Sequence, residues 1–186
     1  MALKSTVYKA TVAIADMDRS LYATHSLTLA RHPSETDERL MVRLLAFALH
    51  VPADGLDGPL AFGRGISDTE DPDLWHTSLA GEIRHWIDVG QPDDRRLVRA
   101  CGRAERVTVY CYSNASSIWW NGIASKLARL DALTVWQLPA AQSQALAALA
   151  TRNMNLQVTV QEGQVWVGDG SESVEIHPVV LKAGKA

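Results

Sequence analysis

The sequence predicts an α/β fold: a single domain over residues 1–186, with one mixed β-sheet, a parallel β-α-β-α-β centre and antiparallel edge hairpins. Two observations lead to this prediction. From residue 82 onward, strand-like runs alternate with helical segments, a pattern that gives parallel strands joined by right-handed crossovers. Both ends of the chain also carry paired strand-like runs separated by turn-prone residues. With 186 residues and no repeat or low-complexity tract, the chain suits one packed core.

The parallel centre is predicted from the hydrophobic periodicity between residues 82 and 138. Residues 107–112 (Val-Thr-Val-Tyr-Cys-Tyr) are almost all apolar or aromatic, as expected for a central strand covered on both faces. The predicted order is strand 82–89, helix 92–103, strand 107–112, helix 116–130, strand 133–138 and an alanine-rich helix over 140–151.

Two hairpins and one further helix complete the prediction. Residues 5–15 and 21–30 alternate between apolar and polar side chains around a turn-prone segment, and residues 156–160 and 165–167 flank a second turn. Between the first hairpin and the parallel centre, apolar residues recur at helical spacing over 35–50. Ser34 is the expected N-cap of this amphipathic helix, because acidic residues fill its first turn.

Composition limits the possible functions. The formal net charge of -3 and the pI near 6.0 argue against a sequence-independent nucleic-acid coat, since such proteins depend on basic residues for phosphate contacts. The sequence has one dense basic run, which consists of Arg95, Arg96, Arg99, Arg103 and Arg106. This run fits a solvated helix face more simply than a nucleic-acid surface. No apolar run approaches the roughly 18 residues that a membrane span needs, so no membrane association is expected. Cys101 and Cys111 show no paired spacing and predict reduced thiols in a cytoplasmic protein.

Three acidic residues are candidates for a site. Asp88 lies near the carboxyl end of a predicted parallel strand, where α/β proteins bind ligands, and Gln91 follows it into the same crevice. The Pro72-Asp73 pair precedes that strand at a spacing that suits metal-dependent phosphodiester cleavage, which needs acidic oxygens on rigid strands. Glu38 lies at the edge of the apolar face of helix 35–50. Simpler interpretations remain open: Asp88 caps or pairs locally, Gln91 ends a loop, and Glu38 is a first-turn acid.

Several segments resemble the bacterial YaeQ family over almost the whole chain. They are Ala2-Leu3-Lys4 with Val7-Tyr8-Lys9-Ala10-Thr11-Val12, Ser26-Leu27-Thr28-Leu29-Ala30-Arg31-His32-Pro33-Ser34-Glu35-Thr36, Glu38-Arg39, Trp86-Ile87-Asp88-Val89-Gly90, Pro92-Asp93 with Arg95-Arg96, and Ile118-Trp119-Trp120 with Ser125-Lys126. The resemblance implies a variation of the PD-(D/E)XK, restriction-endonuclease-like nuclease core. It does not imply an established activity.

The nuclease pattern, carried onto this sequence, assigns metal-binding roles to Glu38, Asp73 and Asp88, with Mg²⁺ or Mn²⁺ as the cofactor. The three carboxylates should then converge closely enough to share one cation. The pattern's lysine, which stabilises negative charge on the phosphate, falls on Gly90 and is missing. Lys126 could replace it, although a surface lysine is the simpler interpretation, and Gln91 could supply a hydrogen bond.

Two functions therefore remain open at the level of sequence. One is a metal-dependent nuclease that acts on DNA or RNA, with Asp73, Asp88, Gln91 and Lys126 in the catalytic set. The other is a non-catalytic, transcription-related regulatory protein that binds nucleic acid or protein and retains the fold. The three acids favour the first function, whereas the missing lysine and the acidic pI favour the second.

Overall fold

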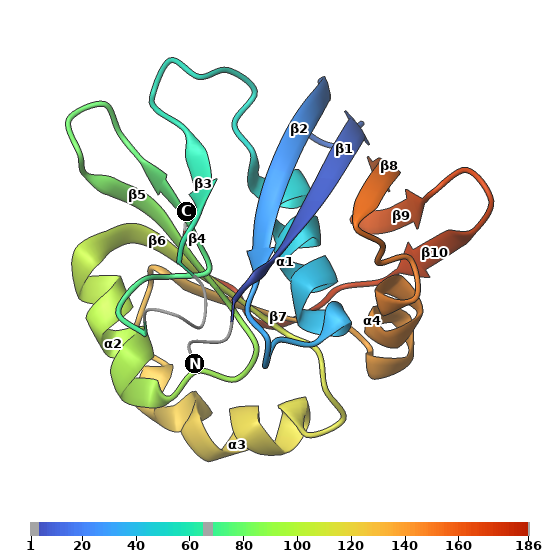
Figure 1. The fold of residues 1–186 in the computed structure, drawn as a ribbon. Helices are drawn as coiled ribbons and strands as arrows, with labels where there is room; N and C mark the ends of the chain where they lie inside the picture. The colour runs from blue at the N-terminus through green and yellow to red at the C-terminus, as the bar shows by residue number, and fades with distance from the viewer. Residues whose placement is uncertain (1–3, 65–68, 186) are drawn as a thin grey trace.

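The computed structural model describes residues 4–64 and 69–185, which form two β-sheets around a buried helix (Figure 1). The expectation of one mixed sheet is therefore wrong in number, whereas the α/β class is confirmed. The five-stranded sheet has the order β10-β9-β8-β1-β2, and the six-stranded sheet has the order β11-β7-β6-β5-β4-β3. Each sheet contains parallel and antiparallel pairs.

The six-stranded sheet contains the predicted β-α-β-α-β centre. Strands β5, β6 and β7 run parallel, and helices α2 and α3 connect them. Antiparallel strands β4 and β3 extend one side of the sheet, and antiparallel β11 extends the other. The bounds are β3 Leu60–Phe62, β4 Leu74–Thr77, β5 Ile83–Val89, α2 Asp94–Arg103, β6 Ala104–Cys111, α3 Ser116–Leu127, β7 Leu133–Gln137 and β11 Val179–Lys182.

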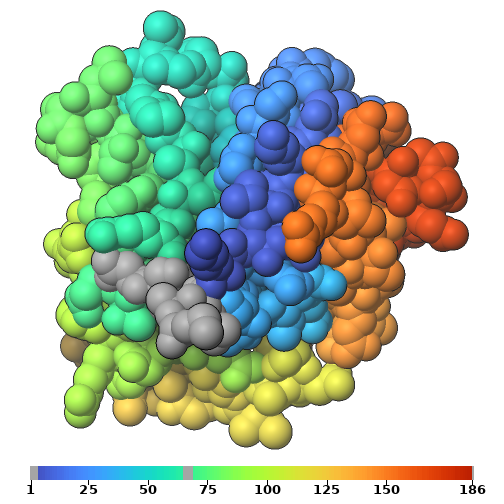
Figure 2. Space-filling model, in the orientation of Figure 1, coloured from blue at the N-terminus to red at the C-terminus, as the bar shows by residue number. Residues whose placement is uncertain are grey.

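The five-stranded sheet joins the two ends of the chain. The predicted N-terminal hairpin pairs β1 with β2, and the predicted C-terminal hairpin pairs β8 with β9. Strand β8 then pairs in parallel with β1. Both hairpins therefore belong to this second sheet, and they do not flank the parallel centre as predicted. The blue N-terminal strands and orange β8 lie side by side in Figure 2. The bounds are β1 Thr6–Asp16, β2 Leu21–Arg31, β8 Asn153–Gln161, β9 Gln164–Gly168 and β10 Ser173–Ile176.

Helix α1 (Asp37–His50) lies between the two sheets (Figure 1). Every residue from Leu40 to Ala48 is buried, so α1 is covered all round and is not an amphipathic surface helix. Each large aliphatic side chain buried there contributes about 1.5–3 kcal/mol to stability. Thr36, not Ser34, is the N-cap: its Oγ1 accepts a hydrogen bond from the Arg39 backbone N–H at 3.1 Å.

A second core packs α2 and α3 against the other face of the six-stranded sheet. Leu97 of α2 and Leu127 of α3 are fully buried there against Trp86 and Val109 of the strands. Helix α4 (Ala140–Ala147) packs against α1. Within residues 4–64 and 69–185, no helix combines the length and apolar character needed to cross a membrane.

Candidate functional site

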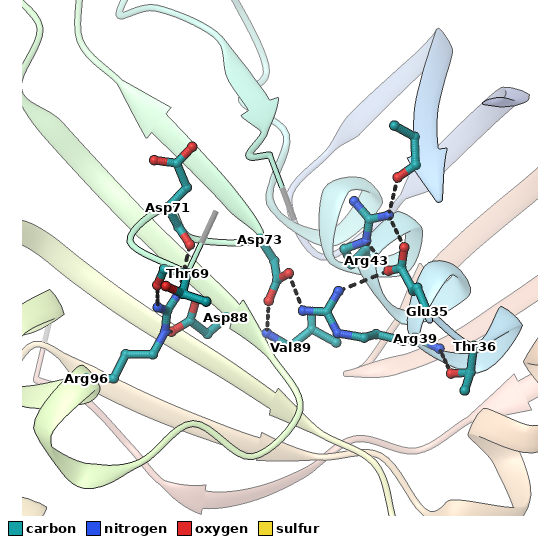
Figure 3. Close-up of polar contacts among 11 residues, drawn as sticks. Glu35, Thr36, Arg39, Arg43, Thr69, Asp71, Asp73, Asp88, Val89 and Arg96 are labelled. Carbon is teal, nitrogen blue, oxygen red and sulfur yellow. Dashed lines mark hydrogen bonds and ion pairs between the residues drawn. The ribbon is translucent and has the colours of Figure 1, made fainter. Parts of the chain in front are cut away.

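The predicted acids Asp73 and Asp88 line one cleft of about 430 Å³ at the edge of the six-stranded sheet. The local topology explains why they meet. Strands β4 and β5 are antiparallel, and Leu74 at the start of β4 pairs with Ile87 near the end of β5. Asp73, which precedes Leu74, therefore lies beside Asp88, which follows Ile87 (Figure 3). The cleft is also lined by Arg39, Gln91, Arg96 and Arg99.

Asp73 is buried and held by two donors. Its Oδ2 accepts a hydrogen bond from the Val89 backbone N–H at 2.7 Å, and its Oδ1 accepts one from Nη2 of Arg39. Only 5% of Asp73 is exposed to solvent. Burial raises the pKa of Asp73 and the nearby charge of Asp88 adds to the rise, although Arg39 and the Val89 N–H oppose it. The two donors thus favour the ionised form of Asp73, whereas burial disfavours it.

Asp88 forms a two-pronged ion pair with Arg96 of α2. Nε of Arg96 donates to Oδ2 at 2.7 Å and Nη2 donates to Oδ1 at 2.9 Å, a bidentate geometry that is stronger than a single contact. Arg96 also donates to the backbone carbonyls of Thr69 and Asp71, so it ties this segment to β5. The hydrogen bond to Asp88 raises the pKa of Arg96 despite partial burial. The guanidinium carbon of Arg96 lies 5.5 Å from the centre of the Trp86 ring.

A chain of charges continues from the cleft into α1. Arg39 donates from Nη1 to Glu35 at 2.9 Å as well as to Asp73. Arg43 donates to both carboxylate oxygens of Glu35, at 2.8 and 2.9 Å, and to the carbonyl of Ala30. Burial opposes ionisation of Arg39, but Asp73 and Glu35 outweigh it and raise its pKa. The network alternates acids and arginines, so no buried charge in it is left uncompensated (Figure 3).

Glu38 does not join the other two acids. It faces α4, where the Ser143 hydroxyl donates to its Oε1 at 2.7 Å, and it does not line the cleft. Within the parts of the chain that the structure describes, no group of three acidic, histidine or cysteine side chains is arranged to hold a metal ion. The expected convergence of three carboxylates on one cation is thus not found.

The cleft in this arrangement does not fit a divalent cation. All four carboxylate oxygens of Asp73 and Asp88 already accept hydrogen bonds, and three of these come from guanidinium groups. Mg²⁺ and Mn²⁺ sites depend on carboxylate oxygens that are free to coordinate. A metal would have to displace Arg39 or Arg96, and two positive guanidinium groups beside it would repel it.

The two candidate replacements for the missing lysine lie in different places. Gln91 lines the cleft and donates from Nε2 to the hydroxyl of Ser113 at 2.6 Å. Lys126 does not line it: its side chain is 61% exposed and pairs with Asp94 at 3.1 Å. Gly90 has a φ of +107°, a conformation that L residues rarely adopt. A lysine at position 90 would be strained in this backbone, which gives a physical reason for its absence.

Arg39, Arg43, Arg96 and Glu35 are the site residues that the sequence interpretation missed. Arg39 and Arg43 are spaced four residues apart, so they lie along one stripe of α1, and Glu35 lies two residues before the helix begins. That stripe faces inward, and the available signal was Arg43 within the otherwise apolar run from Leu40 to Ala48. Arg96 belongs to the basic run, whose other four arginines are solvent-exposed, so nothing in the sequence set it apart.

Comparison with known proteins agrees with the resemblance seen in the sequence. The family described as "YaeQ protein" matches residues 1–178. This chain belongs to the YaeQ family. The YaeQ protein of Salmonella typhi, described as uncharacterized, is 44% identical over 177 residues, which cover 95% of each chain. The uncharacterized YaeQ protein of Escherichia coli K12 is 43% identical over 178 residues, which cover 95% of this chain and 96% of its own.

Solved structures of YaeQ proteins share the fold described above. The crystal structure of YaeQ from Xanthomonas axonopodis pv. citri superposes with a TM-score of 0.90 at 46% identity, covering 96% of this chain and 99% of that one. The Pseudomonas syringae YaeQ structure gives a TM-score of 0.90 at 36% identity and covers 98% of each chain. The two curated relatives are described only as uncharacterized, and they name no function.

Proposed function

We propose that this YaeQ-family chain is a non-catalytic, nucleic-acid-binding regulatory protein built on a variation of the PD-(D/E)XK core. One observation carries the proposal: guanidinium groups occupy the carboxylates that a nuclease would use to hold its metal. Asp73 and Asp88 then serve to fix Arg39 and Arg96, and the cleft keeps its shape without a cation. The absence of a lysine at position 90 is consistent with the loss of hydrolysis.

The nucleic acid would contact the arginine stripe on α2, beside the cleft. Arg95, Arg99 and Arg103 are exposed and follow one another at four-residue intervals, so they lie about 6 Å apart along the helix axis. Arg99 also lines the cleft. Phosphate contacts by arginines supply most non-specific affinity, and their number sets its salt dependence. With a net charge of -3, the protein should bind weakly and only at low salt.

Binding is tested with fluorescein-labelled single-stranded DNA, double-stranded DNA and RNA by fluorescence anisotropy over a series of salt concentrations. The double variant Arg95→Ala/Arg99→Ala should bind more weakly, with a salt slope lower by about 2, or about one unit per lost contact. Arg152→Ala is the matched control, because Arg152 is an exposed arginine just before β8 in the other sheet. If none of the three oligonucleotides binds at low salt, the partner is not nucleic acid and the proposal is wrong.

Metal-dependent hydrolysis is the competing function, and the adjacency of Asp73 and Asp88 is the observation in its favour. It requires Arg39 or Arg96 to leave its carboxylate. The same oligonucleotides are therefore incubated with the protein and millimolar Mg²⁺ or Mn²⁺, with Asp88→Asn as the control. We expect no cleavage by either protein. Cleavage by the wild type that Asp88→Asn abolishes would establish the nuclease and overturn the non-catalytic proposal.

A further inference from the structure

A second cavity, of about 200 Å³, lies at the C-terminal end of α1, away from the cleft. It opens to solvent and is lined by residues of α1, of β6 and β7 in one sheet, of β8 in the other, and of the β1–β2 and β8–β9 turns. Its walls are mainly apolar: Leu49, Trp136, Val160, Val165 and Pro178. A cavity of this character at a junction between secondary-structure layers has the form of a small-molecule site.

The polar end of the cavity is a pair of neutral side chains. Nε2 of His50 lies 2.7 Å from the hydroxyl of Tyr110, and the two share one hydrogen bond. Burial lowers the pKa of His50 well below its usual value, and the positive charges of Arg19 and Arg106 reinforce the effect. Burial also raises the pKa of Tyr110. At neutral pH the pair is therefore uncharged.

The charged groups that line the cavity already have hydrogen-bond partners. Arg19 pairs with Asp16 at 2.6 Å, and its Nη1 and Nη2 each donate one hydrogen bond, to the carbonyls of Val51 and Ala48 at the end of α1. Asp18 accepts hydrogen bonds from two backbone N–H groups in the β8–β9 turn. The only basic side chain among the lining residues, Arg19, is already paired with Asp16, so an anionic ligand would lose its hydration without gaining a free cation, and this desolvation disfavours it.

We propose that this cavity binds a neutral molecule with a single aromatic ring and one hydroxyl or N–H group. The ring lies against Trp136 and the aliphatic walls, and the polar group bonds to the His50–Tyr110 pair. The size supports this class, since an apolar protein cavity of about 150 Å³ holds benzene and about 200 Å³ leaves room for one small substituent. The site is independent of the nucleic-acid proposal for the cleft.

Phenol and aniline are the probes, and benzoate is the charged comparison. Each is titrated into the ¹⁵N-labelled full chain at pH 7, and binding is followed by the shift of the Trp136 indole N–H resonance. We expect saturable shifts with phenol and aniline, and binding of benzoate at least tenfold weaker. Nuclear Overhauser contacts between phenol and the Trp136 ring should appear in the wild-type protein. If phenol and aniline produce no shift up to their solubility limits, or if benzoate binds as well as phenol, the proposal is wrong.

Variants locate the binding. Leu49→Trp fills the cavity and should weaken phenol at least tenfold, whereas Leu56→Trp makes the same change at a residue that is 79% exposed and should have no effect. Tyr110→Phe should weaken phenol but leave toluene unchanged, because toluene has no polar group. If Leu49→Trp does not fold, as judged by circular dichroism, Tyr110→Phe and the Overhauser contacts decide the test. Unchanged phenol affinity in folded Leu49→Trp would place the probe elsewhere and overturn the proposal.

Discussion

The Arg39→Met substitution tests the central feature of the cleft, which is that a guanidinium group neutralises buried carboxylates there. Arg39 bridges Glu35 and Asp73. Methionine keeps much of the aliphatic side chain and removes the charge. Glu35 would retain Arg43, but Asp73 would be left with only the Val89 N–H and would still face Asp88. The folded protein should therefore become markedly less stable.

The size of the loss follows from burial. Removal of one partner from a buried ion pair costs about 3–5 kcal/mol, because the other charge remains buried without compensation. The Arg39 side chain is 18% exposed, so some solvent reaches the pair and the lower end of that range applies. We expect a loss of about 3 kcal/mol in the free energy of unfolding. For a chain of this length that corresponds to a decrease of about 6–12 °C in melting temperature.

The loss should also depend on pH. The pKa of Asp73 is already raised by burial, and removal of Arg39 raises it further. Between the unfolded pKa of about 3.9 and the raised folded pKa, the folded state holds a proton that the unfolded state has released, so stability falls as pH rises through this window. The destabilisation by Arg39→Met should therefore be smaller at pH 5 than at pH 8.

Urea denaturation in EDTA at the two pH values measures both effects. Arg95→Met is the matched control, since Arg95 is exposed on α2 and forms no ion pair within the described residues. It should change stability by no more than about 0.5 kcal/mol. The double variant Arg39→Met/Asp73→Asn should recover part of the loss, because it removes the uncompensated charge. If Arg39→Met is as stable as the wild type at pH 8, or if its loss is equal at both pH values, the electrostatic account is refuted.

Three further outcomes follow from the same contacts. Asp88→Asn removes the bidentate ion pair with Arg96 and should lower the free energy of unfolding, measured by urea denaturation, by about 2 kcal/mol. Unchanged or higher stability would show that the pair is not structural. Arg43→Met should cost about 3–5 kcal/mol, because both Arg43 and Glu35 are almost fully buried, and Glu35→Gln in that background should restore part of it; purely additive losses would contradict the pairing. Burial lowers the pKa of His85 to about 3. As the pH drops from about 6.5, His85 becomes protonated in the unfolded chain but stays neutral in the folded protein, so the free energy of unfolding decreases. His85→Gln should make this acid dependence shallower, and an unchanged slope between pH 6.5 and 4 would contradict the assignment.

Local patterns predicted the elements of this fold well and their assembly poorly. Strands β5, β6 and β7 with their crossover helices, and both hairpins, follow the hydrophobic periodicity of their own residues. The parallel pairing of β8 with β1 joins segments about 140 residues apart, and no local pattern encodes it. Short strands such as β10 and β11 form only because a neighbouring strand supplies their partners, so their four residues gave no signal.

The same distinction explains the outcome at the cleft. Asp73 and Asp88 were predicted to share a site, and the antiparallel register of β4 and β5 brings them together. Glu38 was placed at an edge of the apolar face of α1, but helix periodicity does not indicate which neighbour that edge meets, and it meets Ser143 of α4. The inward-facing arginines were missed for a similar reason, since their burial depends on acids supplied by other elements.

The cleft and the second cavity lie at opposite ends of α1, and this separation makes their tests independent. Glu35 and Arg39 stand at the start of the helix, His50 is its last residue, and 14 helical residues span about 21 Å. Mutations more than about 10 Å apart with no shared partner usually act additively. Arg39→Met combined with Leu49→Trp should therefore lower stability by the sum of the two single effects, within about 0.5 kcal/mol. A larger deviation, measured by urea denaturation of the four proteins, would mean that α1 couples the two sites, and a ligand in the cavity would then alter the stability of the cleft.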